Sequence, residues 1–239
     1  GSLFHGDVGY SNAEYSIIET QPVLGIHLKR NFNYYFGLTL GINRGQIQSK
    51  DAVSSDPFSI AKNNHFKSKI TEFSLLVEFN FKQYLSRDPD YNMSPFIFSG
   101  ISKFYFNPEG QGSDGNWYNL RPLNTEGQES DLYPNRDTYQ LNGIAIPIGI
   151  GYKINVYEYL TLSFNIGWRI TFIDYIDDVS STYVEESILS DLALDITNPN
   201  FNPGFQRGNP YNNDKYGFIG LSILYSIKDP NSGCNDIVY

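Results

Sequence analysis

The stretch 160–173, LTLSFNIGWRITFI, alternates apolar residues with polar or small ones over its whole length. Successive side chains of a β-strand point to opposite faces, so the stretch predicts a strand with one apolar and one polar face. A soluble sandwich would pack the apolar face against a second sheet, whereas a barrel in a lipid bilayer turns it outward and keeps a polar interior. The apolar face carries Leu160, Leu162, Phe164, Ile166, Trp168, Ile170 and Phe172.

Segments 70–82, 144–154 and 218–227 repeat this alternation. The polar faces of the first two contain ionisable residues such as Glu72, Glu78 and Lys153. The connections between such segments alternate between short turns and long loops, as in outer-membrane barrels with short periplasmic turns and long outer loops. We therefore predict an all-β fold, an eight-stranded antiparallel transmembrane β-barrel in the outer membrane with both termini in the periplasm. The expected strands lie near 2–9, 22–30, 35–47, 69–83, 95–106, 140–154, 159–173 and 216–227.

Composition narrows the class of protein further. A net charge of −9 over 239 residues argues against a nucleic-acid partner, because nucleic acids select basic surfaces. The 19 Tyr and 17 Phe suit the aromatic girdles of a barrel, and no run approaches the roughly 20 apolar residues of a spanning helix. We expect a mature, exported chain with a barrel domain at 1–228 and a polar C-terminal periplasmic tail at 229–239.

The barrel interior is predicted to be charged. An eight-stranded barrel is just filled by its own side chains, and an unpaired buried charge is costly, so these charges should pair. We expect a structural network of ion pairs, with a proton or solute path as the alternative. Pro147 predicts a bulge or a locally broken ladder in its strand, and the register of the strand near 95–106 stays open. The predicted interior residues are His27, Lys29, Glu72, Glu78, Lys82, Lys153, Asn165 and Arg169.

Other motifs point to no chemistry. Gly110, Gly112 and Gly115 satisfy G-x-G-x-x-G but lie in a long loop, so dinucleotide binding is not expected. The histidines lack the spacing of a zinc site, and Cys234 is alone. We expect no enzyme, no cofactor and no metal. The acidic loop from Asp174 to Asp195 is interpreted as a solvated surface, with a short helix on the rim within 184–196.

Four segments resemble the PorG family of Bacteroidetes outer-membrane barrels, which is associated with the type IX secretion system. The resemblance implies a non-enzymatic outer-membrane subunit that attaches to a periplasmic ring of PorK lipoprotein and PorN, with other secretion-system subunits as further partners. The segments are Gly6-Asp7-Val8-Gly9, Ala145-Ile146-Pro147-Ile148-Gly149, 168–183 (WRITFIDYIDDVSSTY) and Arg207-Gly208-Asn209.

We expect the docking face for that ring to combine the tail with the turns at Asn31–Tyr34, Tyr84–Ser94 and Asn155–Glu158. Three alternatives stay open: a surface adhesin acting through the outer loops, a barrel enzyme in which Asp7 meets His27, and a soluble lipocalin-like barrel of inverted polarity. The tail residues expected to bind the partner are Lys228, Asp229, Asn231, Cys234, Asp236 and Tyr239.

Overall fold

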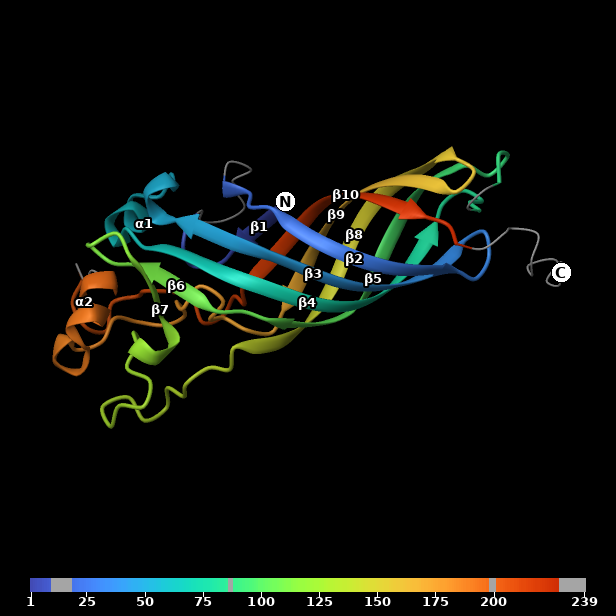
Figure 1. The fold of residues 1–239 in the computed structure, drawn as a ribbon. Coiled ribbons are helices and arrows are strands. Elements are labelled where there is room, and N and C mark those ends of the chain that lie inside the picture. Colours follow the sequence, from blue (N-terminus) through green and yellow to red (C-terminus); the bar gives the residue numbers. More distant parts are fainter. Residues whose placement is uncertain (10–18, 86–87, 198–200, 228–239) are drawn as a thin grey trace.

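The protein is an all-β chain built on one curved antiparallel sheet (Figure 1). A computed structural model describes residues 1–9, 19–85, 88–197 and 201–227. Within them the sheet has ten strands, and its main path runs β1-β10-β9-β8-β5-β4-β3-β2. The described part contains no helix long and apolar enough to cross a membrane.

Each of the eight strands of the main path overlaps one predicted segment, with different ends. The path begins at β1 and ends at β2, and among the described residues no ladder between these two strands closes it into a barrel. Two short strands, β6 and β7, lie where only a loop was expected and extend the sheet beyond β4. The strands are β1 Ser2–His5, β2 Val23–Asn31, β3 Phe36–Lys50, β4 His65–Asn80, β5 Met93–Tyr105, β6 Pro108–Gln111, β7 Trp117–Asn119, β8 Asn142–Tyr157, β9 Leu160–Thr171 and β10 Lys215–Tyr225. The α-helices are α1 Pro57–Lys62 and α2 Asp191–Thr197, and 3₁₀ turns lie at Asp51–Val53, Arg121–Leu123 and Glu186–Ile188.

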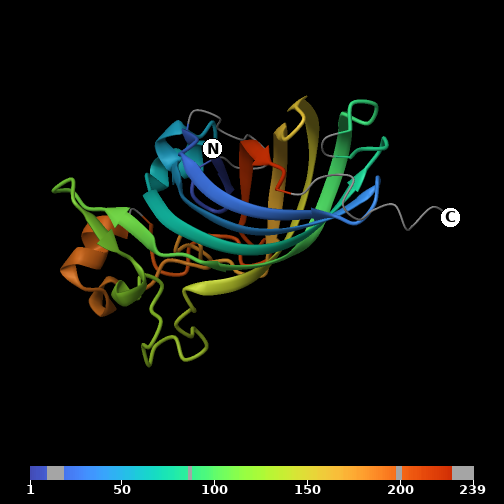
Figure 2. The same cartoon turned by 45° about the vertical axis from the view of Figure 1, so that its right-hand side comes forward.

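The sheet has two different ends (Figure 1). Short connections join β2 to β3 and β8 to β9 at one end, which we call the turn end. The long connections, with α1, α2, β6 and β7, gather at the other, which we call the loop end. The sheet curls about its long axis between them, which gives it a concave inner face and a convex outer face (Figure 2).

Apolar side chains of the strands point outward. Phe164 is 51% exposed and Ile148 is 49% exposed, and similar residues form a continuous band over the outer face of β2 to β10. The inner face instead holds buried polar residues such as Glu72, Lys153 and Arg169. A lipocalin-like barrel would bury the apolar face and expose the polar one, so the alternative of a lipocalin-like barrel does not fit this polarity.

On β4 the apolar band ends abruptly before the loop end. Phe73, Leu75 and Val77 are outward and exposed, but the outward residues nearer the loop end are Lys67 and Lys69, which pair with Glu109 at 3.2 and 3.3 Å. At about 3.4 Å per residue, the 16 residues of β4 are longer than a bilayer requires, even when tilted. The charged part of β4 therefore extends past the apolar band and leads to the loops of the loop end, and the apolar part belongs to the band.

The inward aromatic rings settle the register of β5. Phe96, Phe98 and Phe104 are all buried on the inner face, and Phe104 is fully enclosed. A Cβ atom built at Gly149 would overlap the Phe98 ring, and one at Gly151 would overlap the Phe96 ring. Glycines on β8 thus leave the space that the phenylalanines of β5 fill.

The ladder between β5 and β8 is interrupted at Pro147. Ser99 pairs with Ile148 and Ser102 with Ala145, but the two positions between them make no ladder pair. The register is the same on both sides of the gap, so this is a locally broken ladder without a bulge. The missing N–H of proline explains the gap.

The first strand is shorter than predicted. β1 ends at His5 rather than at Gly9, because the Asp177 carboxylate accepts hydrogen bonds from the N–H groups of Asp7 and Val8 at 2.9 and 3.0 Å. Those two donors are then not free for a neighbouring strand. The segment instead enters the packing of the loop end.

Candidate functional site

A buried network around Glu72 lies on the inner face. Its carboxylate accepts two hydrogen bonds from Arg169, at 2.8 and 3.0 Å, and one from the Tyr216 hydroxyl at 2.8 Å. Asn43 donates a fourth at 3.1 Å and also contacts His27 at 3.0 Å. Glu72 is fully buried, so this bidentate pair is well placed to neutralise both charges.

A second network surrounds Glu78 closer to the turn end. Lys29 donates to this carboxylate at 2.6 Å, and Lys153 donates to the same oxygen. The Lys153 ammonium also lies 4.2 Å from the centre of the Tyr84 ring. One carboxylate thus holds two cations, and the aromatic ring offsets part of the excess positive charge.

The structure brings six of the seven residues predicted to form the ion-pair network into these clusters: His27, Lys29, Glu72, Glu78, Lys153 and Arg169. Asn165 also lies on the inner side, beside the cleft between β2 and β10. Lys82 does not belong to the network. β4 ends at Asn80, so the alternation no longer directs Lys82 inward, and its side chain is exposed.

The three predicted docking turns meet at one buried tyrosine. The Tyr84 hydroxyl bonds to Asn155 at 2.7 Å and to Thr161 at 2.9 Å, while its backbone N–H donates to the Tyr34 carbonyl at 3.1 Å. The Asn155 amide in turn donates to the Leu85 carbonyl at 3.1 Å. The turn end is therefore one hydrogen-bonded surface, and sequence alternation gave no sign of this because Tyr84 lies outside any strand.

Exposed aromatic residues surround the turn end. Tyr159 and Tyr225 contact each other with ring centres 5.3 Å apart, and Phe79 contacts Phe36 and Phe81 at 5.3 and 5.5 Å. Tyr and Trp side chains are typical of the interface between hydrocarbon and water. Members of this belt that the structure describes are Phe32, Tyr34, Tyr35, Phe36, Phe81, Tyr157, Tyr159 and Tyr225.

The loop end has a polar core of its own, centred on Glu126 and Arg207. Both are buried, and the guanidinium donates to the carboxylate at 3.0 Å. Glu126 also accepts from the N–H groups of Ser180 and Ser181 at 3.0 and 3.1 Å. Arg207 is 3.9 Å from Asp178 and donates to its carbonyl at 3.0 Å. These contacts join three segments that are far apart in sequence.

Three of the four segments that resemble PorG sequences converge in this core, whereas Ala145–Gly149 lies within β8. Asp7 accepts from the Asn209 N–H at 2.9 Å, and Asp177 accepts from the backbone of 7–8. The buried Lys62 ammonium of α1 donates to the carbonyls of Asp7 and Arg207 at 2.9 and 3.1 Å. Segments 6–9, 168–183 and 207–209, which are far apart in the sequence, are thus parts of one packed unit.

Burial raises the pKa of several aspartate carboxyl groups in this unit. Removal from water raises the pKa of Asp7 to about 6, of Asp178 to about 6 and of Asp174 to about 7. The pKa values of Asp177 and Asp214 are also raised well above their ordinary value, first by burial and then by neighbouring carboxyl groups. The interpretation of Asp174, Asp177 and Asp178 as a solvated acidic surface is wrong, because backbone and hydroxyl donors hold them inside.

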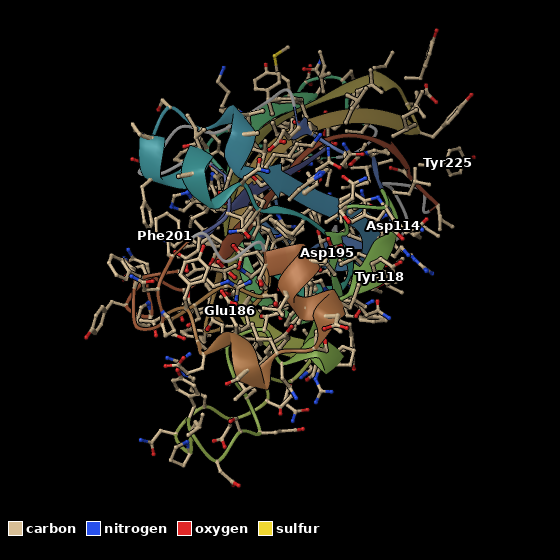
Figure 3. All side chains as sticks on the ribbon, turned by 90° about the vertical axis from the view of Figure 1, so that its left-hand side faces the viewer. Asp114, Tyr118, Glu186, Asp195, Phe201 and Tyr225 are labelled. Carbon is tan, nitrogen blue, oxygen red and sulfur yellow. The ribbon has the colours of Figure 1, made fainter. Side chains whose placement is uncertain are left out.

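Figure 3 shows the loop end from outside, with α2 in front of the hairpin β6–β7. Asp195 of α2 accepts from the Ser113 N–H at 2.8 Å, and Tyr118 of β7 donates to Asp114 at 2.7 Å. A short helix was predicted on the rim within 184–196, and the α-helix found there, α2, spans Asp191–Thr197. The G-x-G-x-x-G pattern lies in the same hairpin, between two strands rather than before a helix, so it is not a dinucleotide motif.

The remaining predictions have separate outcomes. Asp7 and His27 lie on opposite sides of the bridge between Ser2 and Gln21, so they do not form the catalytic pair that a barrel enzyme would need. Among the described residues no cluster of acidic, histidine or cysteine side chains could hold a metal ion. The tail residues Lys228, Asp229, Asn231, Cys234, Asp236 and Tyr239 lie outside the described residues.

The fold and its polarity define a class of all-β protein with an apolar outer band and a charged interior. Residues 1–119 match a family described as a domain of unknown function (DUF6089). The match includes β1 to β7 and ends before β8. A search of curated proteins found no match.

Proposed function

We propose that this chain is an outer-membrane β-barrel that acts, without enzymatic activity, as a component of the type IX secretion system. In this role it anchors a periplasmic ring of PorK-like and PorN-like proteins to the outer membrane, with other secretion-system subunits as further partners. The observation that carries the membrane part is the apolar outer band over a charged interior, because such a band is stable only against lipid or another apolar surface.

The two ends support an orientation. Outer-membrane barrels keep short turns in the periplasm and extend long loops outside, so the turn end faces the periplasm. The aromatic belt of the turn end then lies at the inner interface of the membrane. At the loop end, the charged outward residues Lys67 and Lys69 of β4 stand outside the bilayer.

The secretion role rests on the PorG resemblance. Its segments Gly6–Gly9, 168–183 and Arg207–Asn209 meet in the loop-end core, which gives their shared sequence a common structural purpose. The ring lies in the periplasm, so the turn end is the docking face. Hydrogen bonds from Tyr84 join the three turns of the turn end into a single surface, which favours resistance to deformation when a large ring binds.

A pair of charge-reversal variants tests the docking face. Asp90 and Glu158 are exposed at the turn end, and Glu185 and Glu186 are exposed at the loop end. D90K/E158K and E185K/E186K change the net charge equally. Ring proteins recovered with the chain from native membranes in mild detergent should fall several-fold for D90K/E158K and stay unchanged for E185K/E186K.

Equal recovery of the ring from both variants and the parent would contradict the docking face. Heat-dependent mobility on SDS gels serves as the control that each variant still folds. Deletion of 229–239 in the same assay tests the tail: the docking role predicts weaker ring recovery without loss of folding.

One observation favours a second function, a surface adhesin or ligand-binding barrel. Tyr211 at the loop end is 93% exposed, and Phe205 and Leu132 are also largely exposed, on loops that a polar core holds in place. Firmly held aromatic residues are typical anchors of binding surfaces. Y211S should abolish surface adhesion while leaving ring recovery intact if this second function holds; loss of neither would leave the adhesin without support.

A further inference from the structure

β1 lies in a gap between β10 and the chain that enters β2, and this gap, which we call the slot, continues past the N-terminal end of β1. β1 pairs with β10 from Ser2–Phe218 to His5–Lys215, and Gly1 exchanges two backbone hydrogen bonds with Ile219, at 2.6 and 2.8 Å. On its other side, the Ser2 N–H donates to the Gln21 carbonyl at 2.9 Å. At Gly1 and Ser2, one strand thus fits between β10 and the chain that enters β2, and it is hydrogen-bonded to both.

Beyond Gly1 the two sides have no strand between them. In the described part of the chain, β2 pairs only with β3, and β10 after Ile219 pairs only with β9. Residues of both edges, including His27 of β2 and Ser222 of β10, line one open cleft of about 540 Å³ (Figure 2 shows the two edges of the curled sheet).

Side chains beside the slot are more exposed than their equivalents elsewhere in the band. Ile26 and Ile223 are 82% and 70% exposed, whereas Ile42 on β3 and Ile148 on β8 are about half exposed. Each edge strand also directs half of its backbone N–H and C=O groups into the slot. In hydrocarbon such unpaired backbone groups have no water to bond to, so a membrane-spanning sheet cannot leave the slot empty.

β2 and β10 cannot pair with each other in the antiparallel way in which the other neighbours of the main path pair. β1 is antiparallel to β10 and, at Ser2–Gln21, antiparallel to the chain entering β2. β2 and β10 therefore run parallel to each other. A direct pair would be the one parallel ladder of the main path, whereas a strand antiparallel to both edges continues the existing pattern.

We propose that the slot is the site of a further length of extended chain, continuous with the N-terminal end of β1 and antiparallel to both edges. This inference rests on the membrane location proposed above. Its occupant is a segment of the same polypeptide joined ahead of Gly1, because β1 already enters the slot, bonded on both sides. The length needed to reach the turn end is on the order of seven residues, which would make β1 about as long as its neighbours β9 and β10.

The register also specifies the chemistry of this segment. Counting back from Gly1, the second residue lies between Leu24 and Leu221, and the fourth lies between Ile26 and Ile223. These positions face outward and call for apolar side chains. The first and third residues face inward beside Gly220 and Ser222, where small or polar side chains fit.

The first test determines the N-terminus of the mature protein purified from native outer membranes, by top-down mass spectrometry. The proposal predicts at least several residues ahead of Gly1, apolar at the second and fourth positions. A mature chain that begins at Gly1 overturns it. The same preparation reports ring recovery separately, so loss of the ring alone counts against the proposed function and not against the slot.

The second test places the segment by disulfide cross-linking. In a C234S background, an alternating extension carries cysteine at the fourth position ahead of Gly1, combined with I26C or, separately, I223C. Both cross-links should form within one chain, and both should fall several-fold when one inserted residue shifts the extension out of phase. No cross-link, dimers between copies, or direct bonding of I26C to I223C without an extension would each overturn the proposal.

Discussion

The pair formed by Glu72 and Arg169 gives the most quantitative prediction. Both side chains are buried and joined by two hydrogen bonds at 2.8 and 3.0 Å. Removing one partner leaves the other charge buried without compensation, which typically costs about 3–5 kcal/mol. E72Q and R169Q should each lower the free energy of unfolding by that amount.

The double variant should cost far less than the sum of the single variants, because no charge is then left alone. We expect a coupling free energy of about 2–3 kcal/mol. The assay is urea unfolding in detergent micelles, followed by tryptophan fluorescence. The matched control is the exposed pair Lys69–Glu109, for which the cycle K69Q/E109Q should give a coupling below about 1 kcal/mol. Additive costs for the buried pair would refute the account of the interior.

Three further predictions concern the interior and the loop end. Burial raises the pKa of Asp174 from 3.8 to about 7, so the protonated form is favoured in the folded state, and stability is lost as pH rises through this range. D174N should therefore slow proteolysis of the loops at pH 8 but not at pH 5; equal protection at both values would contradict this. E78Q should destabilise the fold more than K153M, because it leaves two ammonium groups together; urea midpoints in the opposite order would contradict the network. G149V should lower the free energy of unfolding by about 1–3 kcal/mol, because the new side chain overlaps the Phe98 ring and the Ile166 carbonyl oxygen. F98L relieves only the first overlap and should restore part of the loss in a heat-dependent gel assay; no rescue would exclude the Phe98 ring as a cause.

The faces of the strands could be predicted from sequence because the period of a strand is two. Alternation placed Phe164 outward and Glu72 inward, and the structure agrees. It also indicated which side chains face inward within a strand, but not where the strand ends. Lys82 was misplaced for that reason, since β4 ends two residues earlier.

The loop end could not be predicted because its order comes from contacts between distant segments. Asp177 looks like a solvated acid in the sequence, yet its partners are backbone N–H groups of Asp7 and Val8. No local pattern reveals such a partner. The same contact shortens β1, so one unpredictable hydrogen-bond acceptor accounts for both errors.

The fluorescence of Trp168 reports whether the apolar band faces the bilayer. Its side chain belongs to the outward face of β9, level with Ile148 of β8, whereas Trp117 lies in the loop-end hairpin. In a W117F variant reconstituted into vesicles, bromine on the lipid acyl chains should strongly quench Trp168 fluorescence. Fluorescence unaffected by brominated lipid would show that the apolar band does not face the bilayer and would contradict the membrane-barrel account.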